Sequence, residues 1–298
     1  MTIRIGTRNS ALAIWQAEHV QKALSPLPTE IVGISTKGDQ DQNTPLHQLG
    51  QTGVFTKAID QALLEGKVDI GVHSLKDYPT QIPEGLALIA VLERDEYHDV
   101  FIPSETPGDD FFVRDLLIAS GSPRRRAQWL ARYPNHRFTE LRGNMHTRLE
   151  RMAMMDGGIV SKAGLTRLGI LPDKHITLDW MIPAPAQGII AIVGRIDDIR
   201  IHETIRSVNH LPSFQAATIE RDFMAEIEAG CAAPLGALAQ FRGDHFRFSG
   251  ILNSLDGRVS VRTEKQVSLN NWKEAGQNFA QHILKIGGRE IMKTLRQP

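Results

Sequence analysis

Two charged residues follow an apolar segment in the first third of the chain. Lys76 and Asp77 stand just after residues 68–73, whose composition predicts a short buried strand. In open α/β sheets, ligands are bound beyond the carboxyl ends of the strands. An ordinary turn, favoured by Pro79, explains the pair equally well. Position alone therefore makes the pair a candidate site and no more.

Arginine is concentrated in one stretch of the chain. Positions 124–151 hold eight arginines and two glutamates, which leaves a local excess of six positive charges. The stretch contains no lysine, and the planar guanidinium of arginine suits bidentate pairing with carboxylate or phosphate. For any single arginine, a solvated helix surface is an equally good explanation.

The start of a predicted helix strengthens the anion-binding interpretation. Ser122 suits the N-cap and Pro123 the first helical position. A helix N-terminus attracts anions through its free N–H groups and its dipole, and Arg124 and Arg125 add two positive charges there. Residues 142–148 repeat this arrangement at the next predicted helix start. The sequence therefore predicts an anion site at these helix starts.

The single cysteine, Cys231, lies between Gly230 and Pro234 in a predicted loop. A lone cysteine excludes an internal disulfide and a multi-cysteine metal cluster. A buried thiol packed as a small apolar side chain is the commoner role for such a residue. The alternative is an exposed thiol that acts as a nucleophile or as an attachment point.

Composition restricts the class of protein. The 298 residues include 34 Lys plus Arg, 34 Asp plus Glu and 41% hydrophobic residues, so the net charge is zero and a core can form. Zero net charge argues against a nucleic-acid or membrane partner. The start of the chain lacks an export-signal pattern, and the histidines stand at no metal-ligand spacing. We expect a globular cytoplasmic protein, an enzyme by preference, without a metal.

The elements that must position these residues alternate between strand and helix patterns over the first two thirds of the chain. This alternation predicts open α/β domains with parallel sheets. The last 85 or so residues change character, with three strand patterns at short spacing between helices. This part predicts a small α+β domain with an antiparallel meander.

Taken together and in this order, the motifs resemble the hydroxymethylbilane synthase family, also called porphobilinogen deaminases. The matching segments span almost the whole chain: Gly6-Thr7-Arg8-Asn9-Ser10 with Trp15-Gln16, Thr36-Lys37-Gly38-Asp39, Val72-His73-Ser74-Leu75-Lys76-Asp77, Ser122-Pro123-Arg124-Arg125, Leu141-Arg142-Gly143-Asn144, Ala163-Gly164-Leu165 with Arg167, Pro185-Ala186-Gln187-Gly188, and Gly230-Cys231.

The resemblance implies a transferase that condenses four porphobilinogen molecules head to tail on a dipyrromethane cofactor. Ammonia is lost at each addition, and hydrolysis releases the linear tetrapyrrole hydroxymethylbilane, a precursor of porphyrin and heme. The resemblance gives Asp77 the catalytic role and makes Cys231 the site of covalent attachment through a thioether. Because each pyrrole carries an acetate and a propionate, clustered arginines suit the growing chain.

Further residues match family positions that hold the cofactor or the substrate. The resemblance assigns to the cofactor Lys76, Ser74, Ser122, Arg124, Arg125, Arg148 and Gly164. It assigns to the substrate Arg8, Ser10, Arg142, Arg167 and Gln187.

The implied fold has two doubly wound α/β domains of the periplasmic-binding-protein type, flanking a cleft, and a small C-terminal α+β domain with a three-stranded antiparallel sheet. We expect domain 1 at residues 1–95 plus about 188–210, domain 2 at 96–187 and domain 3 at 211–298. The resemblance also suggests a monomer. The segment between Arg148 and Ala163 is about two residues shorter than the family pattern. Four residues also depart from that pattern: Gln48 and Thr52 in place of loop lysines, Lys162 in place of a small or apolar residue, and Ala186 in place of a glycine.

Two other classes of protein are considered. A non-catalytic, two-lobed carboxylate-binding protein accounts for the arginines and for the site after the strand. It does not need Cys231, however, and such receptors usually carry an export signal, whose pattern is missing here. An RNA-binding module explains residues 124–126 and little else, because aromatic residues are sparse around them.

Overall fold

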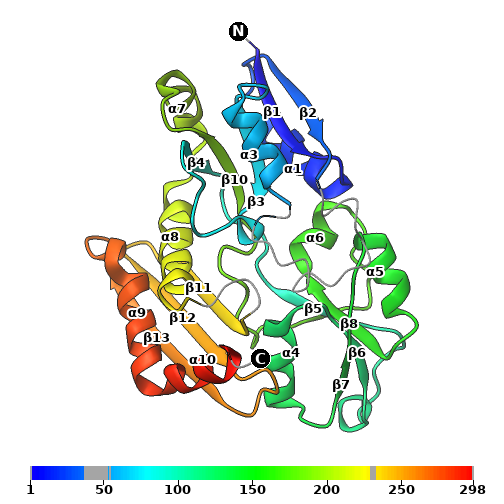
Figure 1. Ribbon diagram of the computed structural model, residues 1–298. Coiled ribbons are helices and arrows are strands. Elements are labelled where there is room, and N and C mark those ends of the chain that lie inside the picture. The colour runs from blue at the N-terminus through cyan, green and yellow to red at the C-terminus, as the bar shows by residue number, and fades with distance from the viewer. Residues whose placement is uncertain (1, 37–52, 54, 229–232, 297–298) are drawn as a thin grey trace. The chain divides into compact units, whose positions relative to one another are not determined.

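A computed structural model describes residues 2–36, 53, 55–228 and 233–296. The chain forms two compact units (Figure 1). Unit 1 comprises Met1–Asp95 and Gln187–Gln215, and unit 2 comprises Glu96–Ala186 and Ala216–Pro298. Each unit therefore combines segments that lie far apart in the sequence. The predicted boundaries of three domains stay a prediction.

Unit 1 is built on a five-stranded mixed sheet in the order β2-β1-β3-β10-β4. Strands β1 and β2 run parallel, as do β1 and β3, whereas β10 runs antiparallel to both β3 and β4. Its strands are β1 (Ile3–Arg8), β2 (Thr29–Ile34), β3 (Ile70–Ser74), β4 (Leu86–Val91) and β10 (Ile190–Arg195).

Helices cover both faces of this sheet. Helix α1 (Ala11–Ala23) starts at the N-cap Ser10 and buries Ala13, Gln16, Ala17 and Val20, which recur at helical spacing. Its apolar side chains pack with those of α7 (Ile199–Ile205) against one face of the sheet. On the opposite face, α3 (Lys57–Leu64) lies so close that a Cβ added to Gly71 would stand 2.9 Å from Ile59 Cγ2. Successive β3 side chains therefore point to α1 and to α3 in turn.

Unit 2 contains a second five-stranded mixed sheet, in the order β7-β6-β8-β5-β9. Strand β6 runs parallel to β7 and β8, and β5 runs antiparallel to β8 and β9. The strands are β5 (Asp99–Pro103), β6 (Leu117–Ala119), β7 (Arg137–Thr139), β8 (Gly157–Ser161) and β9 (Ile176–Thr177). Helix α4 (Pro123–Arg132) packs on one face through Trp129. Helices α5 (Met145–Met152) and α6 (Lys162–Arg167) pack on the other.

The rest of unit 2 is a three-stranded antiparallel sheet in the order β11-β12-β13. It packs through Phe246 and Phe248 against side chains from three helices. The strands are β11 (Leu235–Phe241), β12 (His245–Asn253) and β13 (Ser260–Ser268), and the helices are α8 (Leu211–Glu226), α9 (Ala275–Ile283) and α10 (Arg289–Arg296).

The predicted fold class is confirmed: two sheets covered by helices on both faces, and a small C-terminal antiparallel sheet with helices. The expectation of parallel sheets is correct for β1, β2 and β3 and for β6, β7 and β8, but both sheets are mixed. Strand β10 is antiparallel to its neighbours in the sheet of unit 1, and β5 is antiparallel to its neighbours in the sheet of unit 2. Each follows directly on a point where the chain passes from one unit to the other, after Asp95 and after Ala186.

Candidate active site

Three strand ends of unit 1 meet at one edge of its sheet. Because β1 and β3 are parallel, Arg8 at the end of β1 and Ser74 at the end of β3 share that edge. Strand β10 runs the other way, with Ile190 paired to Ser74, so Gln187 just before β10 comes to the same edge. The topology thus gathers predicted site residues that are more than 100 positions apart.

The turn after β3 carries Lys76 and Asp77. It is a short 3₁₀ helix, Leu75–Asp77, held by fully buried Leu75, whose N–H donates to the Ile189 carbonyl at 3.0 Å. Asp77 is exposed, whereas the Lys76 ammonium donates to Gln187 Oε1 at 3.4 Å. Gln187 itself is buried. The turn therefore presents an exposed carboxylate beside a positive charge.

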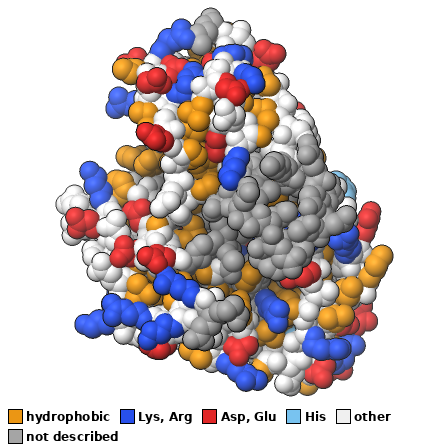
Figure 2. Space-filling view, in the orientation of Figure 1, with side chains coloured by type: hydrophobic (Ala, Val, Ile, Leu, Met, Phe, Trp, Pro, Cys, Tyr) orange, Lys and Arg blue, Asp and Glu red, His pale blue; other side chains and the backbone are white. Residues whose placement is uncertain are grey.

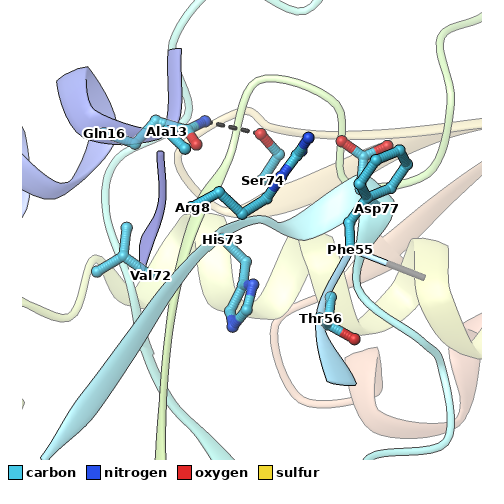
Figure 3. A pocket seen from close by; sticks show the side chains of 9 residues that line it. All are labelled: Arg8, Ala13, Gln16, Phe55, Thr56, Val72, His73, Ser74 and Asp77. Carbon is cyan, nitrogen blue, oxygen red and sulfur yellow. Dashed lines mark hydrogen bonds between the residues drawn. The ribbon is translucent and has the colours of Figure 1, made fainter. Parts of the chain in front are cut away.

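A pocket opens at this edge, lined by Arg8, Phe55, His73, Ser74 and Asp77 among others. In Figure 3, Arg8, Ser74 and Asp77 gather on one side of the β3 end. The Gln16 amide of α1 donates to Ser74 Oγ at 2.7 Å, and the Arg8 guanidinium lies 4.1 Å from the centre of the Phe55 ring. These contacts hold the Ser74 hydroxyl and the Arg8 guanidinium in the pocket that Asp77 also lines. Ser10, also predicted for the substrate, accepts from the Ala13 N–H at 3.4 Å as the cap of α1.

His73 is a pocket residue to which the sequence analysis gave no role. Its side chain points away from Ser74 and Asp77 (Figure 3), and its ring centre lies 4.8 Å from that of Tyr78, with the two ring planes tilted by 48°. Burial, together with the nearby positive charge of Arg8, lowers the pKa of His73 to about 3. His73 is therefore neutral at physiological pH.

Tyr78 connects the Leu75–Asp77 turn to α3. It is 1% exposed, and its hydroxyl donates to Asp60 Oδ1 at 3.0 Å. Burial raises the pKa of Asp60, although the Tyr78 hydroxyl opposes this effect. His73, Tyr78 and Asp60 thus form a buried polar group behind the turn that carries Asp77. A single sequence gives no local signal for such a group, because it joins an element at 60 to one at 73–78.

The arginines of unit 2 meet at the corresponding edge of the second sheet. Helices α4 and α6 follow the parallel strands β6 and β8, and the β7–α5 connection follows β7. Strand β5 is antiparallel to β8, so its first residue, Asp99, lies at this same edge, paired with Ser161. The predicted residues at this edge are Ser122, Arg124, Arg125, Arg142, Arg148, Gly164 and Arg167.

Arg124 and Arg125 share a buried carboxylate. Arg124 Nη1 donates to Asp99 Oδ2 at 2.7 Å, and Arg125 Nε donates to Asp99 Oδ1 at 3.0 Å. Asp99 is fully buried, and the two arginine side chains are 5% and 9% exposed. Burial, and to a smaller extent the charge of Arg125, lowers the pKa of Arg124, while Asp99 raises it. Ser122 caps α4 as predicted by accepting from the Arg125 N–H.

Of the other arginines at this edge, Arg148 is held by a main-chain carbonyl and Arg167 is buried, whereas Arg142 is half-buried. Arg148 Nε donates to the Gly143 carbonyl at 2.9 Å, and the Arg142 carbonyl accepts from Arg151 Nη1 at 3.1 Å. Gly143 takes a φ of +104°, which favours glycine. Gly164 and Arg167 are buried on α6.

Two departures from the family pattern have structural partners. The Lys162 ammonium lies 3.2 Å from a Glu96 carboxylate oxygen, so an ion pair occupies the place of the small or apolar residue. Ala186 adopts a φ of +61°, and its N–H donates to buried Glu220 at 2.6 Å. Cys231, Gln48 and Thr52 lie outside the described residues.

Two models of known protein families match this chain. A family model described as "Porphobilinogen deaminase, dipyromethane cofactor binding domain" matches residues 3–203, and one described as "Porphobilinogen deaminase, C-terminal domain" matches residues 214–285. The chain belongs to the porphobilinogen deaminase family.

Individual relatives agree with this assignment. The porphobilinogen deaminase of Syntrophomonas wolfei is 36% identical over 303 residues, covering 99% of each chain. That of Campylobacter hominis is 34% identical over 304 residues, covering 99% of this chain and 98% of its own.

Among solved structures, the second substrate-binding domain of a putative amino acid ABC transporter from Streptococcus pneumoniae has a TM-score of 0.44 and 10% identity, over 70% of this chain and 92% of its own.

The family assignment confirms several expectations. Porphobilinogen deaminases are transferases of tetrapyrrole biosynthesis, and the matched domain is named for its dipyrromethane cofactor. The assignment does not favour the alternative of a non-catalytic carboxylate-binding protein. The roles of single residues, including attachment at Cys231, stay predictions.

Two kinds of feature are absent from the described residues. No helix in the described ranges is long and apolar enough to cross a membrane. In the same ranges, no three or more His, Cys, Asp and Glu side chains form a group that could hold a metal ion. Figure 2 shows acidic and basic side chains interspersed over the visible face.

Proposed function

We propose that this porphobilinogen deaminase is a hydroxymethylbilane synthase. It joins four porphobilinogen molecules head to tail onto a covalent dipyrromethane primer and releases the linear tetrapyrrole by hydrolysis. At each addition the C–N bond of the aminomethyl group breaks and ammonia leaves. A carbon–carbon bond forms to the free α-carbon of the growing chain, which loses a proton. One water then enters at release, so that four substrates and one water give the product and four ammonia.

The observation that carries this proposal is the exposed Asp77 carboxylate on the turn after β3, next to Lys76 and in a pocket that Arg8 also lines. Loss of ammonia leaves a substrate ring with positive charge on its nitrogen. A fixed carboxylate beside that nitrogen stabilises the developing charge and can move a proton. Asp77 is proposed for this catalytic role.

The basic groups around Asp77 suit the acidic substituents of the substrate. Porphobilinogen carries an acetate and a propionate, and the guanidinium of Arg8 can pair with a carboxylate through two N–H groups. Lys76, held by Gln187, offers a second positive charge. Arg8, Ser10, Gln187, Arg142 and Arg167 are proposed to bind the substrate.

The buried arginines of unit 2 fit the cofactor. The cluster consists of two guanidiniums and one carboxylate, so it carries a net charge of one positive unit. All three groups are nine-tenths buried or more. Such a cluster suits a carboxylate-bearing ligand better than a neutral one. The residues proposed to hold the cofactor are Lys76, Ser74, Ser122, Arg124, Arg125, Arg148 and Gly164, with Cys231 as its covalent attachment. When bound, the dipyrromethane supplies the terminal carbon to which the first substrate ring is joined.

Intact mass tests the covalent part of the proposal. Protein from cells that make porphobilinogen should carry a mass excess of two pyrrole units, and the Cys231→Ser variant should lack it. An unmodified wild-type mass would contradict the proposal.

The proposal also keeps the expectation of a cytoplasmic monomer that binds no nucleic acid, and sedimentation analysis of the loaded protein tests the oligomeric state.

A further inference from the structure

The buried arginine cluster of unit 2 contains an acidic residue that belongs to none of the sequence motifs. We propose that Asp99 is a positioning residue, which orients Arg124 and Arg125 and leaves one positive charge of the pair for a carboxylate of the dipyrromethane. The inference rests on the proposed function, in which both arginines hold the cofactor.

The geometry of the cluster assigns each Asp99 oxygen to a different arginine. Oδ2 accepts from Arg124 Nη1 at 2.7 Å, and Oδ1 lies 3.0 Å from Arg125 Nε and 2.8 Å from Arg125 Nη2. Charge-assisted hydrogen bonds of this length restrict the orientation of both planar guanidiniums. Asp99 itself is fixed by its place in β5, whose backbone pairs with β8.

Backbone carbonyls complete the support. Arg124 Nη1 also donates to the Ile182 carbonyl at 2.9 Å, and Arg125 Nη1 donates to the Ile159 carbonyl at 3.4 Å. These acceptors fix direction, but they carry no net charge. Among the described residues, Asp99 is the carboxylate that forms ion pairs with the two guanidiniums. The cluster therefore holds one more positive than negative charge.

A surplus charge in a buried place is unfavourable without a counter-ion. Arginine does not relieve the cost by losing its proton, because its pKa is too high. In the described part of the chain, Nε and Nη2 of Arg124 donate to no acceptor. A carboxylate that reached these N–H groups would balance the charge and use donors that the fold has already oriented.

A merely electrostatic role for Asp99 predicts the opposite result on mutation. The Asp99→Asn variant makes the cluster more positive, so simple attraction would strengthen the binding of an anionic cofactor. If Asp99 orients the arginines, the variant binds the cofactor less well despite its extra charge. The sign of the change in cofactor retention therefore separates the two roles.

The experiment measures cofactor retention and its stabilising effect in holoenzyme. Wild type, Asp99→Asn and the control Asp69→Asn are produced in cells that make porphobilinogen, and the loaded fraction is read from intact mass. Asp69 is a matched control, because it is a buried aspartate paired at 2.8 Å with Arg4 in unit 1. Melting temperatures are compared for each loaded protein and its Cys231→Ser counterpart.

We expect Asp99→Asn to lower the loaded fraction and to shrink the rise in melting temperature that loading produces. Asp69→Asn should destabilise the loaded and unloaded proteins equally. The proposal would be overturned if Asp99→Asn lowered the melting temperatures of the loaded and unloaded proteins equally, or if its loaded fraction matched that of wild type. Should Asp99→Asn fail to fold, Asp99→Glu keeps the charge but moves the carboxylate by one methylene, and it should also lower the loaded fraction. Full loading of Asp99→Glu with an undiminished rise on loading would again overturn it.

Titration with succinate separates failure of this inference from failure of the proposed function. Succinate is a dicarboxylate that needs no thioether, and it should raise the melting temperature of the Cys231→Ser protein. The rise should be lost in the Arg124→Met variant and reduced in Asp99→Asn. Absence of the covalent excess in wild type would count against the proposed function alone, whereas an Asp99-independent succinate effect would overturn the role of Asp99.

Discussion

The charged groups at the edges of the two five-stranded sheets lie in opposite surroundings. In unit 1, Asp77 is exposed on a short turn, and the groups that fix the turn are buried behind it. In unit 2, the charged groups Arg124, Arg125 and Asp99 are themselves buried and bonded to one another. An exposed carboxylate can meet successive substrates, whereas a buried cluster suits a ligand that stays. The contrast fits catalysis at the first edge and retention of the cofactor at the second.

Substitution of Asp77 should separate activity from stability most strongly. Asp77→Asn removes the charge that we propose stabilises the developing cation, and turnover should fall about 10²- to 10⁴-fold. Because Asp77 is exposed, the melting temperature should stay close to that of wild type. Steady-state ammonia release and calorimetry measure the two effects.

Asp197→Asn is a matched control for this variant. Asp197 is also exposed in unit 1, but it follows β10, whose end lies away from the Asp77 edge because β10 is antiparallel to β3. Near-normal turnover of folded Asp77→Asn would refute the contrast between the edges, as would an equal loss in Asp197→Asn.

Substitution of Arg125 should produce the reverse pattern. Arg125→Leu leaves Asp99 paired with Arg124 alone, which removes the surplus charge offered to the cofactor. The loaded fraction should collapse, and the free energy of unfolding should fall by about 1.5–3 kcal/mol from lost charge-assisted hydrogen bonds. Intact mass and urea unfolding check both. The exposed neighbour Arg126, changed to Leu, should leave loading intact. Full loading with a normal KM in Arg125→Leu would contradict the assignment.

Substitution of Tyr78 tests the buried support of the exposed edge. Tyr78→Phe keeps the ring but leaves buried Asp60 without its hydroxyl donor. We expect a loss of about 1–2 kcal/mol in unfolding free energy, together with a fall in kcat larger than any change in KM. Urea unfolding and steady-state kinetics measure them. Unchanged stability would show that the turn does not depend on this contact.

Acid should weaken unit 1 through His73. The pKa of His73 is about 3 in the folded protein, below the ordinary value of 6.5, so the unfolded chain binds the proton more readily. Stability is therefore fully present above pH 6.5 and declines as the pH falls toward 3, by at most about 1.4 kcal/mol per pH unit. Unfolding free energies at pH 7 and pH 5 should converge in His73→Asn. The exposed His146, changed to Asn, should keep the wild-type decline.

Local patterns in the sequence predicted most elements and the positions of several site residues. The N-cap Ser122 and the strand before Asp77 are local features, and the structure has both. Strand β8 has a weak local pattern, since it contains two glycines. A Cβ at Gly158 would stand 2.1 Å from Met152 Sδ, so close packing in the fold requires glycine there.

The partners of the charged residues could not be predicted. Asp99 stands 25 positions before Arg124, and the two meet only because β5 runs antiparallel to β8. Strand direction leaves no mark on local periodicity. For the same reason, local patterns do not reveal that His73 is neutral or that Tyr78 is hydrogen-bonded to Asp60.

The most direct test of the account is the mass of the protein during a limited reaction. Loaded wild type mixed with a small excess of porphobilinogen should show up to four successive additions, each of one porphobilinogen less one ammonia. Asp77→Asn should carry the cofactor but show the additions far more slowly. A wild-type mass that does not change with porphobilinogen, or a ladder that forms equally fast in Asp77→Asn, would contradict the account.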